Sequence, residues 1–261
     1  MKRIFQYRNR NLISYAEYGD ENGYPILVQH GLIASICDHQ LFEGLTESEL
    51  RLILIARPGY GESSPYYMSN VAEWGEIISI LVDELRLSRF DILGISSGAP
   101  YSYSIGHKFP YKAKNIFILS GTPALYDDRV LAVWPYPVDK NADIPSLQKL
   151  AHDLFFSNLS QEALSQNDIK DTMKNNCFGI ALDFKLRCNN WGFLLSEIKQ
   201  DVYMQHSKTD DQIPFAAAET TSKLLPRCHF DIRENGDHFS KETFAQFINS
   251  IILQHYGIRD A

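Results

Sequence analysis

Hydrophobic and polar positions along the chain form two alternating patterns. Between short apolar runs of strand length, segments such as Val71 to Leu87 carry apolar residues at steps of three and four, and Phe244 to Ile252 repeats this helical spacing. Strands that alternate with helices indicate a mostly parallel sheet with helices on both faces, so we predict the α/β fold class. The six runs predicted as strands are Ile26 to Gln29, Leu52 to Ala56, Phe90 to Gly94, Ile116 to Ser120, Val202 to His206 and His229 to Arg233.

Residues at the ends of the helical segments support this assignment. Ser69 and Asn70 precede the first segment as candidate N-caps, because their side chains can accept hydrogen bonds from the first helical amides. Gly257 follows the last segment, and glycine readily adopts the left-handed turn that ends many helices. We therefore expect a helix after Asn70 and a helix end at Gly257.

The segment from about Pro123 to Lys199 interrupts the alternation. Its apolar residues cluster at helical spacing without a clear strand, as at Leu147 and Leu150. Strand signals resume at Val202, so we predict a helical insertion over the sheet edge where open α/β folds bind ligands. Because 261 residues lie within the range of one large domain, the predicted organisation is one core domain, residues 1–122 and 200–261, with a helical lid, residues 123–199.

The charge and composition of the chain narrow the range of partners. A formal net charge of -7 argues against a protein that binds nucleic acid or anionic lipid mainly through positive charge. Hydrophobic residues at 44% and charged residues at 22% exclude a disordered or fibrous chain. We expect a small-molecule substrate, no nucleic acid and no membrane as partners, and the sequence leaves open whether the chain forms a homo-oligomer.

Neither the cysteines nor the N-terminal residues point to a metal site or an exported protein. The 4 cysteines form no CxxC pair and none of the histidines suggests a metal site, so we expect reduced thiols and neither a metal nor an organic cofactor. The basic N-terminal residues are not followed by an apolar segment, and no apolar run approaches the roughly 18 residues that a membrane helix needs. We therefore expect a cytoplasmic protein.

One short motif is typical of a serine nucleophile. The segment Gly94 to Gly98 fits G-x-S-x-G, in which a serine occupies a sharp turn between a strand and a helix. The strand predicted from Phe90 precedes the motif, and a segment with Pro100 in its first turn, where proline is tolerated, can open a helix after it. We predict Ser96 as the nucleophile, and the alternative is a turn in which Ser96 only caps a helix.

A serine hydroxyl is a weak nucleophile, so the hypothesis requires a histidine base and an acid that orients it, both later in the chain. Asp210 follows the strand predicted to end at His206, which places a carboxylate on a loop at the carboxyl end of that strand. His238 lies in the loop between the last predicted strand and the final helix. We predict Asp210 as the acid and His238 as the base, with Asp211 as the alternative acid and His206 as the alternative base.

Acyl transfer also requires two backbone N–H donors for the oxyanion of its tetrahedral intermediate. One usually belongs to the residue after the nucleophile, here Ser97, and the other to the loop after an earlier strand. The strand predicted to end at Gln29 runs into His30 and Gly31, and the glycine lets the backbone approach the site. We predict the amides of Leu32 and Ser97 as the oxyanion hole.

Five elements, in the right order from His30 to His238, resemble those of the α/β-hydrolase superfamily. The resemblance implies an α/β-hydrolase fold and serine hydrolase chemistry. Within the superfamily, the sequence is similar to a group of uncharacterised bacterial and plant hydrolases at Ala56 to Gly61, Gly94 to Tyr101 and Trp191 to Phe193. The five elements are the oxyanion-loop pair His30-Gly31, the glycine turn Arg57 to Ser63, the nucleophile elbow Gly94 to Gly98, the acid loop Asp210 to Pro214 and the base segment Gly236 to His238.

The resemblance implies hydrolysis of an acyl bond, most simply a carboxylic ester. Serine at the elbow disfavours the epoxide hydrolases and dehalogenases of similar shape, which use aspartate there. Two positions depart from the superfamily pattern, because Ser97 stands where glycine is common and Ser207 replaces the glycine expected after His206. Three alternatives stay open: an aminopeptidase like the proline iminopeptidases, a C–C bond hydrolase with the same triad, and a ligand-binding protein without catalysis.

The predicted lid leaves the substrate undefined. An aminopeptidase would need lid acids to hold a substrate amine, with Asp139, Asp143, Glu162 and Asp168 as candidates, although solvated helix charges are the simpler interpretation. Aromatic residues of the lid either line a pocket or pack its helices, and packing is the default. These aromatic residues are Trp134, Tyr136, Phe155, Phe156, Phe178, Trp191 and Phe193.

Overall fold

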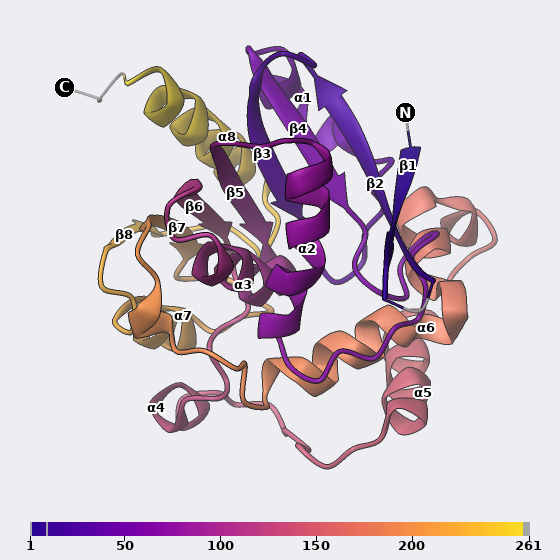
Figure 1. Ribbon diagram of the computed structural model, residues 1–261. Coiled ribbons are helices and arrows are strands. Elements are labelled where there is room, and N and C mark those ends of the chain that lie inside the picture. The colour runs from indigo at the N-terminus through magenta and orange to yellow at the C-terminus, as the bar shows by residue number, and fades with distance from the viewer. Residues whose placement is uncertain (1, 9, 258–261) are drawn as a thin grey trace.

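A computed structural model of the protein describes residues 2–8 and 10–257. Within them, one eight-stranded sheet has the strand order β1-β2-β4-β3-β5-β6-β7-β8 (Figure 1). β2 is antiparallel to both of its neighbours, and every other pair from β4 to β8 is parallel. The strands are β1 (Lys2–Tyr7), β2 (Asn11–Gly19), β3 (Tyr24–Gln29), β4 (Leu50–Ile55), β5 (Phe90–Ile95), β6 (Ala113–Leu119), β7 (Asp201–Ser207) and β8 (Cys228–Arg233).

Helices cover both faces of this sheet, and α2 and α3 lie in front of it in Figure 1. α2 and α3 pack on one face, in a cluster that includes Leu27 and Ile53, whereas α1 and α8 pack on the other face with Val28 and Leu54. Because adjacent residues of β3 and β4 alternate between the two clusters, these strands are buried on both sides, as in other parallel sheets. The helices are α1 (Glu43–Thr46), α2 (Ala72–Glu84), α3 (Ala99–Lys108), α4 (Asp128–Leu131), α5 (Ile144–Phe155), α6 (Asn167–Arg187), α7 (Phe215–Ser222) and α8 (Lys241–Tyr256).

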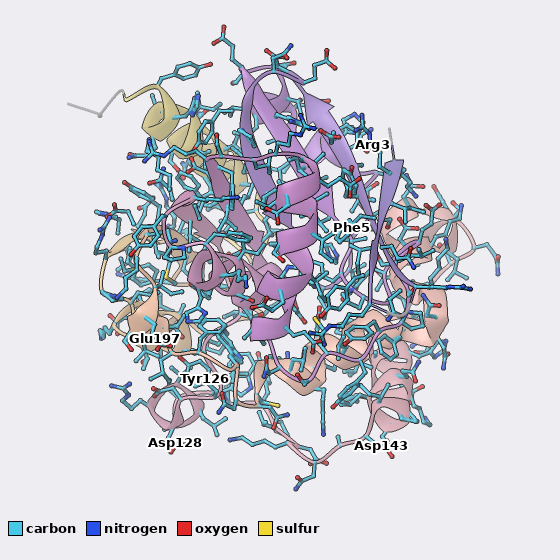
Figure 2. The ribbon with its side chains drawn as sticks, in the orientation of Figure 1. Arg3, Phe5, Tyr126, Asp128, Asp143 and Glu197 are labelled. Carbon is cyan, nitrogen blue, oxygen red and sulfur yellow. The ribbon has the colours of Figure 1, made fainter. Side chains whose placement is uncertain are left out.

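The six predicted strands are present as β3 to β8, but the sequence analysis did not identify β1 and β2. β1 is an edge strand in which Phe5, labelled in Figure 2, and Tyr7 are the buried residues. The three apolar residues of the six, Ile4, Phe5 and Tyr7, do not alternate strictly with polar ones, so the pattern is too weak to distinguish a strand from a polar terminus. The mostly parallel sheet with helices on both faces was therefore predictable, whereas its antiparallel edge was not.

The expected helix ends agree with the structure. Asn70 Oδ1 accepts a hydrogen bond from the Glu73 amide at 3.2 Å, and Glu73 Oε2 accepts one from the Ser69 amide at 2.8 Å. These two hydrogen bonds connect Ser69 and Asn70 to the first turn of α2, whose N-cap residue is Val71. α8 ends at Gly257, whose φ of 69° is left-handed.

The chain between β6 and β7 forms helices, and no strand occurs in it among the described residues. α6 is interrupted at residues 174–177, where Asn175, Asn176 and Cys177 have left-handed backbone angles. α6 contacts the loops after β3 and β4, because the Ala34 amide bonds to Thr172 Oγ1 and the Gly61 amide bonds to the carbonyl of Asp171. The segment thus lies against the carboxyl ends of these strands, and its function as a lid stays a prediction.

Candidate active site

Ser96 occupies a strained turn between β5 and α3. Its φ is 50°, which non-glycine residues seldom adopt, and the one-turn 3-10 helix Ser96–Gly98 leads directly into α3. A Cβ at Gly98 would lie 2.2 Å from the Gln29 carbonyl oxygen, and one at Gly94 would lie 2.3 Å from Ser102 Oγ. Both motif glycines are therefore required by close packing around the serine.

The structure brings His238 and Asp210 to Ser96, although 142 residues separate the serine from the histidine. His238 Nε2 lies 2.9 Å from Ser96 Oγ, and His238 Nδ1 lies 2.8 and 3.1 Å from the two carboxylate oxygens of Asp210. A carboxylate only accepts, so Nδ1 carries the imidazole proton and Nε2 is free to accept the serine hydroxyl proton. All three residues are buried or nearly so.

The surroundings of Asp210 keep its carboxylate ionised. Burial raises the pKa of this group, but hydrogen bonds from His238 and from the amides of Ile213 and Gln212 outweigh burial, so the pKa is lowered overall. Asp211, the alternative acid, instead accepts a hydrogen bond from the backbone amide of His238 at 3.3 Å. Asp210 therefore orients the imidazole ring and Asp211 binds the backbone of the same residue.

His206, the alternative base, lies behind Asp210 and has no contact with Ser96. Its Nε2 donates to the Ile213 carbonyl at 2.9 Å and is 3.5 Å from Asp210 Oδ2. Burial lowers the pKa of His206, and its Nδ1 has no partner within residues 2–8 and 10–257. The geometry therefore favours His238 over His206 at the serine.

Two peptide groups flank Ser96 with their N–H bonds held in defined directions. The C=O and N–H of a trans peptide point in opposite directions. The Gly31 carbonyl accepts from Arg57 Nη2 at 3.0 Å, which turns the Leu32 N–H away from Arg57, and this N–H has no acceptor in the described part of the chain. The Ser96 carbonyl accepts from the Thr122 amide at 2.9 Å, so the Ser97 N–H points the other way. Both predicted amides are thus fixed through their carbonyl partners.

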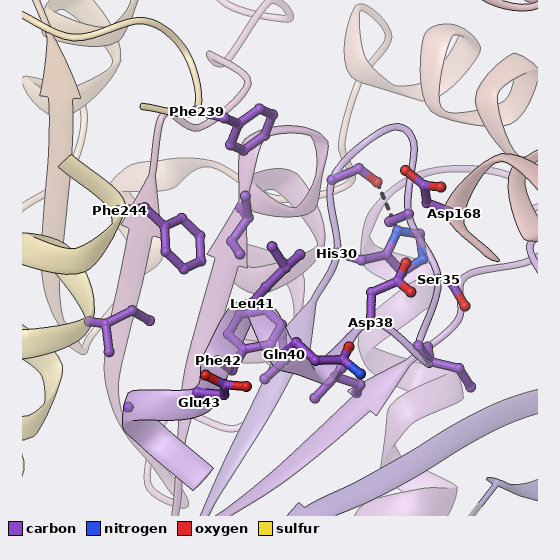
Figure 3. Close-up of a pocket in the computed structure, with 18 of the residues that line it drawn as sticks. His30, Ser35, Asp38, Gln40, Leu41, Phe42, Glu43, Asp168, Phe239 and Phe244 are labelled. Carbon is purple, nitrogen blue, oxygen red and sulfur yellow. Dashed lines mark hydrogen bonds between the residues drawn. The ribbon is translucent and has the colours of Figure 1, made fainter. Parts of the chain in front are cut away.

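A cavity of about 540 Å³ lies beside these residues, between the loop after β3 and the start of α8 (Figure 3). It is lined by Gly31 and by Phe239, and a Cβ built on Gly31 would be 3.8 Å from both Phe239 Cζ and Ser96 Cβ. In Figure 3, Phe239 and Phe244 lie on one side of the cavity and Asp168 lies on the other. The cavity therefore reaches the immediate neighbourhood of Ser96.

The sequence analysis did not identify the main walls of this cavity. None of the seven aromatic residues proposed for the lid lines it, and Trp191 and Phe193 are buried in the core cluster of α2 and α3. The walls come from the loop after β3 and from α8, including Phe42, Phe244 and Ile248. Packing was therefore the better interpretation for the lid aromatics with respect to this cavity.

Most of the candidate lid acids have local structural contacts. Asp139 accepts from the amides of Asn141 and Ala142, and Asp143 caps α5 by accepting from the Ser146 amide. Glu162 is exposed, and Asp168 lines the cavity. Asp143 lies at the surface in Figure 2, at the start of α5. These contacts do not assemble the four carboxylates into an amine site.

Across the described residues, no group of three or more His, Cys, Asp or Glu side chains is arranged to hold a metal ion. The four cysteines are free thiols. No helix within residues 2–8 and 10–257 has the length and hydrophobicity needed to cross a membrane.

Comparisons with known proteins establish the fold. An esterase from Exiguobacterium antarcticum is 19% identical and superposes with a TM-score of 0.72 over 97% of this chain and 99% of its own. An alpha/beta hydrolase enzyme, MGS-M2, from a Medee basin deep-sea metagenome library is 18% identical, with a TM-score of 0.71 over 99% of this chain and 98% of its own. These likenesses confirm the predicted α/β-hydrolase fold.

Comparisons of sequence alone give only a partial match. No protein-family model matches the chain. A 145-residue segment is 23% identical to the dihydrolipoyllysine-residue acetyltransferase component of the acetoin cleaving system of Pseudomonas putida, covering 54% of this chain and 39% of that protein. The chain thus matches well under half the length of this relative, whose activity says nothing direct about the present site.

Proposed function

We propose that this protein is a serine hydrolase that cleaves an acyl bond, a carboxylic ester, of a small substrate. The observation that supports this most strongly is the continuous chain of hydrogen bonds from Ser96 through His238 to Asp210. The esterase and hydrolase among the structural neighbours agree with the proposal, but at 18% and 19% identity they show only the fold. The activity is therefore argued from the site itself.

In the first step, His238 Nε2 removes the hydroxyl proton of Ser96 as Oγ attacks the carbonyl carbon of the ester. The new Oγ–C bond forms while the electron pair of the carbonyl moves onto oxygen, and Asp210 stabilises the resulting imidazolium. The amides of Leu32 and Ser97 donate to the oxyanion. Loss of one such donor typically costs about 2.7 to 4 kcal/mol in the transition state.

The tetrahedral intermediate collapses when its C–O bond to the leaving group breaks. His238 donates its proton to the departing alkoxide, which leaves as an alcohol, and the acyl group remains on Ser96 as a serine ester. A water molecule then attacks this acyl-enzyme with His238 again as the base, which releases the acid and restores the serine. Each proton that His238 accepts is returned within the same half-reaction, so the cycle balances without a further reactant.

The cavity supports an apolar acyl group as the part of the substrate that is recognised. Its walls include Ile36, Phe42, Phe244 and Ile248, which are buried or partly buried apolar residues. Burial of such surface contributes about 0.8 kcal/mol for each methylene group. We therefore propose that the acyl chain extends from Ser96 past Gly31 into this cavity.

Intact mass measurement after exposure to a fluorophosphonate probe tests the proposal, because this reagent phosphonylates activated serines. We expect one adduct on the wild type and none on Ser96→Ala, together with ester turnover that the variant lacks. Absence of an adduct and of turnover on folded wild type would contradict an enzyme and favour the ligand-binding alternative. Turnover of aminoacyl amides or of C–C bonds, but not of esters, would retain the triad and reject the ester.

A further inference from the structure

A buried carboxylate from α6 lies next to the residues proposed for catalysis. Asp183 is 3% exposed, and its carboxylate accepts hydrogen bonds from four side chains. Arg57 Nη2 donates at 2.7 Å, the Tyr60 hydroxyl at 2.9 Å and the Ser97 hydroxyl at 3.0 Å, and the fourth donor is the hydroxyl of Tyr101. The sequence analysis did not identify Asp183, and the motif departure at Ser97 supplies one of its donors.

The same partners of Asp183 also hold the loop that follows β3. Arg57 donates from Nη1 to the carbonyl of His30 and from Nη2 to the carbonyl of Gly31. The Tyr60 hydroxyl lies 2.9 Å from the Leu32 carbonyl, so its single proton is shared between this oxygen and Asp183. Three consecutive carbonyl groups therefore face Arg57 and Tyr60.

Arg57 shares the Gly31 carbonyl oxygen with His30 Nδ1, which lies 2.8 Å from it, and both contacts help to set the direction of the Leu32 amide. The Gly31–Leu32 peptide is planar and trans, so its N–H lies opposite the carbonyl that Arg57 binds. Asp183 in turn fixes Arg57, because two guanidinium nitrogens, Nε and Nη2, donate to its two carboxylate oxygens. On the other side of the site, the Ser97 side chain is held by the same carboxylate.

We propose that Asp183 is a positioning residue that holds both halves of the oxyanion hole, so that docking of α6 on the core completes the active site. This inference rests on the proposed hydrolase function. It assigns the segment between β6 and β7 a part in catalysis that is distinct from covering the substrate.

The chemistry of the cluster fits this assignment better than a contribution to stability alone. Replacing a buried ion pair by apolar side chains often leaves the stability of the fold unchanged or raises it. The presence of such a pair is therefore weak evidence that it serves only to stabilise the fold. Neighbouring residues of α6, such as Leu182 and Phe184, already supply apolar packing. Burial and the charge of Asp183 raise the pKa values of Tyr60 and Tyr101, so both hydroxyls stay protonated and able to donate.

The direct test is Asp183→Asn, assayed for ester hydrolysis and for binding of a trifluoromethyl ketone that carries an acyl chain. The ketone adduct on Ser96 bears an oxyanion, so its affinity reports on the oxyanion hole. We expect kcat to fall by about 10- to 100-fold, less than the outright loss of a donor, with KM changed by less than about threefold. Affinity for the ketone should fall by a similar factor.

Asp91→Asn is the matched control. Asp91 is also a 3% exposed carboxylate that accepts hydrogen bonds, but it lies at the start of β5, whereas Ser96 follows the end of that strand. We expect its kcat and ketone affinity to equal those of the wild type. An equal loss in both variants, or wild-type kcat and ketone affinity in folded Asp183→Asn, would overturn the positioning role.

Two tyrosine variants provide a second test that leaves the ion pair of Arg57 and Asp183 in place. Such a test is needed because removing one partner of a buried ion pair, as in Asp183→Asn, destabilises the fold. Tyr60 and Tyr101 are both fully buried and both bind Asp183, but only Tyr60 also contacts the Leu32 carbonyl. We expect Tyr60→Phe to lower kcat and ketone affinity more than Tyr101→Phe does. Equal effects of the two changes would contradict the inference.

Failure of this inference can be distinguished from failure of the proposed function. Wild type that reacts with fluorophosphonate and hydrolyses esters, while Asp183→Asn keeps wild-type kcat, rejects the positioning role alone. Wild type that shows neither reaction rejects the hydrolase, and the inference with it.

Discussion

The buried carboxylate of Asp91 makes the stability of the protein depend on pH. Asp91 lies at the start of β5, where its oxygens accept hydrogen bonds from the amide and side chain of Asn115. Burial raises its pKa from 3.8 to about 6, in spite of these hydrogen bonds. The folded protein therefore binds a proton at Asp91 more tightly than the unfolded chain does.

The sign and size of the effect follow from this difference. Between about pH 4 and pH 6 the folded state holds a proton that the unfolded state has lost, so the free energy of unfolding decreases as pH rises through this range. Above about pH 6 Asp91 is ionised in both states, and the full loss in the free energy of unfolding is reached. A difference of about two pKa units corresponds to a loss of about 3 kcal/mol. Near pH 5 about half of this cost is present.

Urea unfolding of wild type and Asp91→Asn at about pH 8 and about pH 5 measures this contribution. The amide stays neutral and keeps an oxygen that can accept from the Asn115 amide, so the variant should gain stability relative to the wild type at the higher pH. We expect its advantage to be about 1.5 kcal/mol larger at pH 8 than at pH 5, or about 3 to 6 °C in Tm.

Glu84→Gln controls for the loss of one negative charge, because Glu84 is exposed on α2. Its stability relative to the wild type should change much less between the two pH values. If the gain in the free energy of unfolding from Asp91→Asn is the same at both pH values, burial does not raise the pKa of Asp91 in the folded state, and the reasoning is wrong.

Two further predictions concern the site. Asp210→Asn should lower kcat for esters by about 10³- to 10⁴-fold while leaving the fold intact, because an amide donor at Nδ1 favours the wrong tautomer of His238, and steady-state kinetics with circular dichroism check this. Ala245→Trp, at an exposed position of α8 that lines the cavity, should lower kcat/KM for octanoyl esters more than for acetyl esters, whereas Ala216→Trp, exposed on α7 away from the cavity, should affect neither. Equal losses for both chain lengths in Ala245→Trp would remove the acyl chain from this cavity.

The fold was largely predictable because local pattern and tertiary burial agree in its central strands. β5 is buried at every residue, and its sequence is a short apolar run with a single carboxylate, Asp91. β1 alternates only weakly, since exposed basic residues such as Arg3 occupy the edge of the sheet and pair with Glu17 on β2. Edge strands are held by such cross-strand contacts, and a single sequence does not reveal which residues will lie opposite each other.

The candidate site also has one part that the sequence predicts and one part that it does not. The juxtaposition of Ser96, Asp210 and His238 could be predicted because each follows a strand, and parallel strands bring their carboxyl ends to one edge of the sheet. The cavity and Asp183 could not, because no local pattern marks them. Asp183 stands in a helix between Leu182 and Phe184, a position where a carboxylate is ordinarily solvated.

The hydrogen bond to Asp183 explains why position 97, where the motif commonly has glycine, can hold a serine. The Ser97 side chain, directly after Ser96, is buried at 7% exposure, and a buried hydroxyl needs a hydrogen-bond partner. Asp183 of α6 supplies that partner, so the buried Ser97 hydroxyl is satisfied by the segment between β6 and β7. Ser97→Gly would remove the hydroxyl but leave the contacts from Asp183 to Arg57 and Tyr60, which orient the Leu32 amide. The second serine of the motif therefore links the turn at Ser96 to α6 through a hydrogen bond to Asp183.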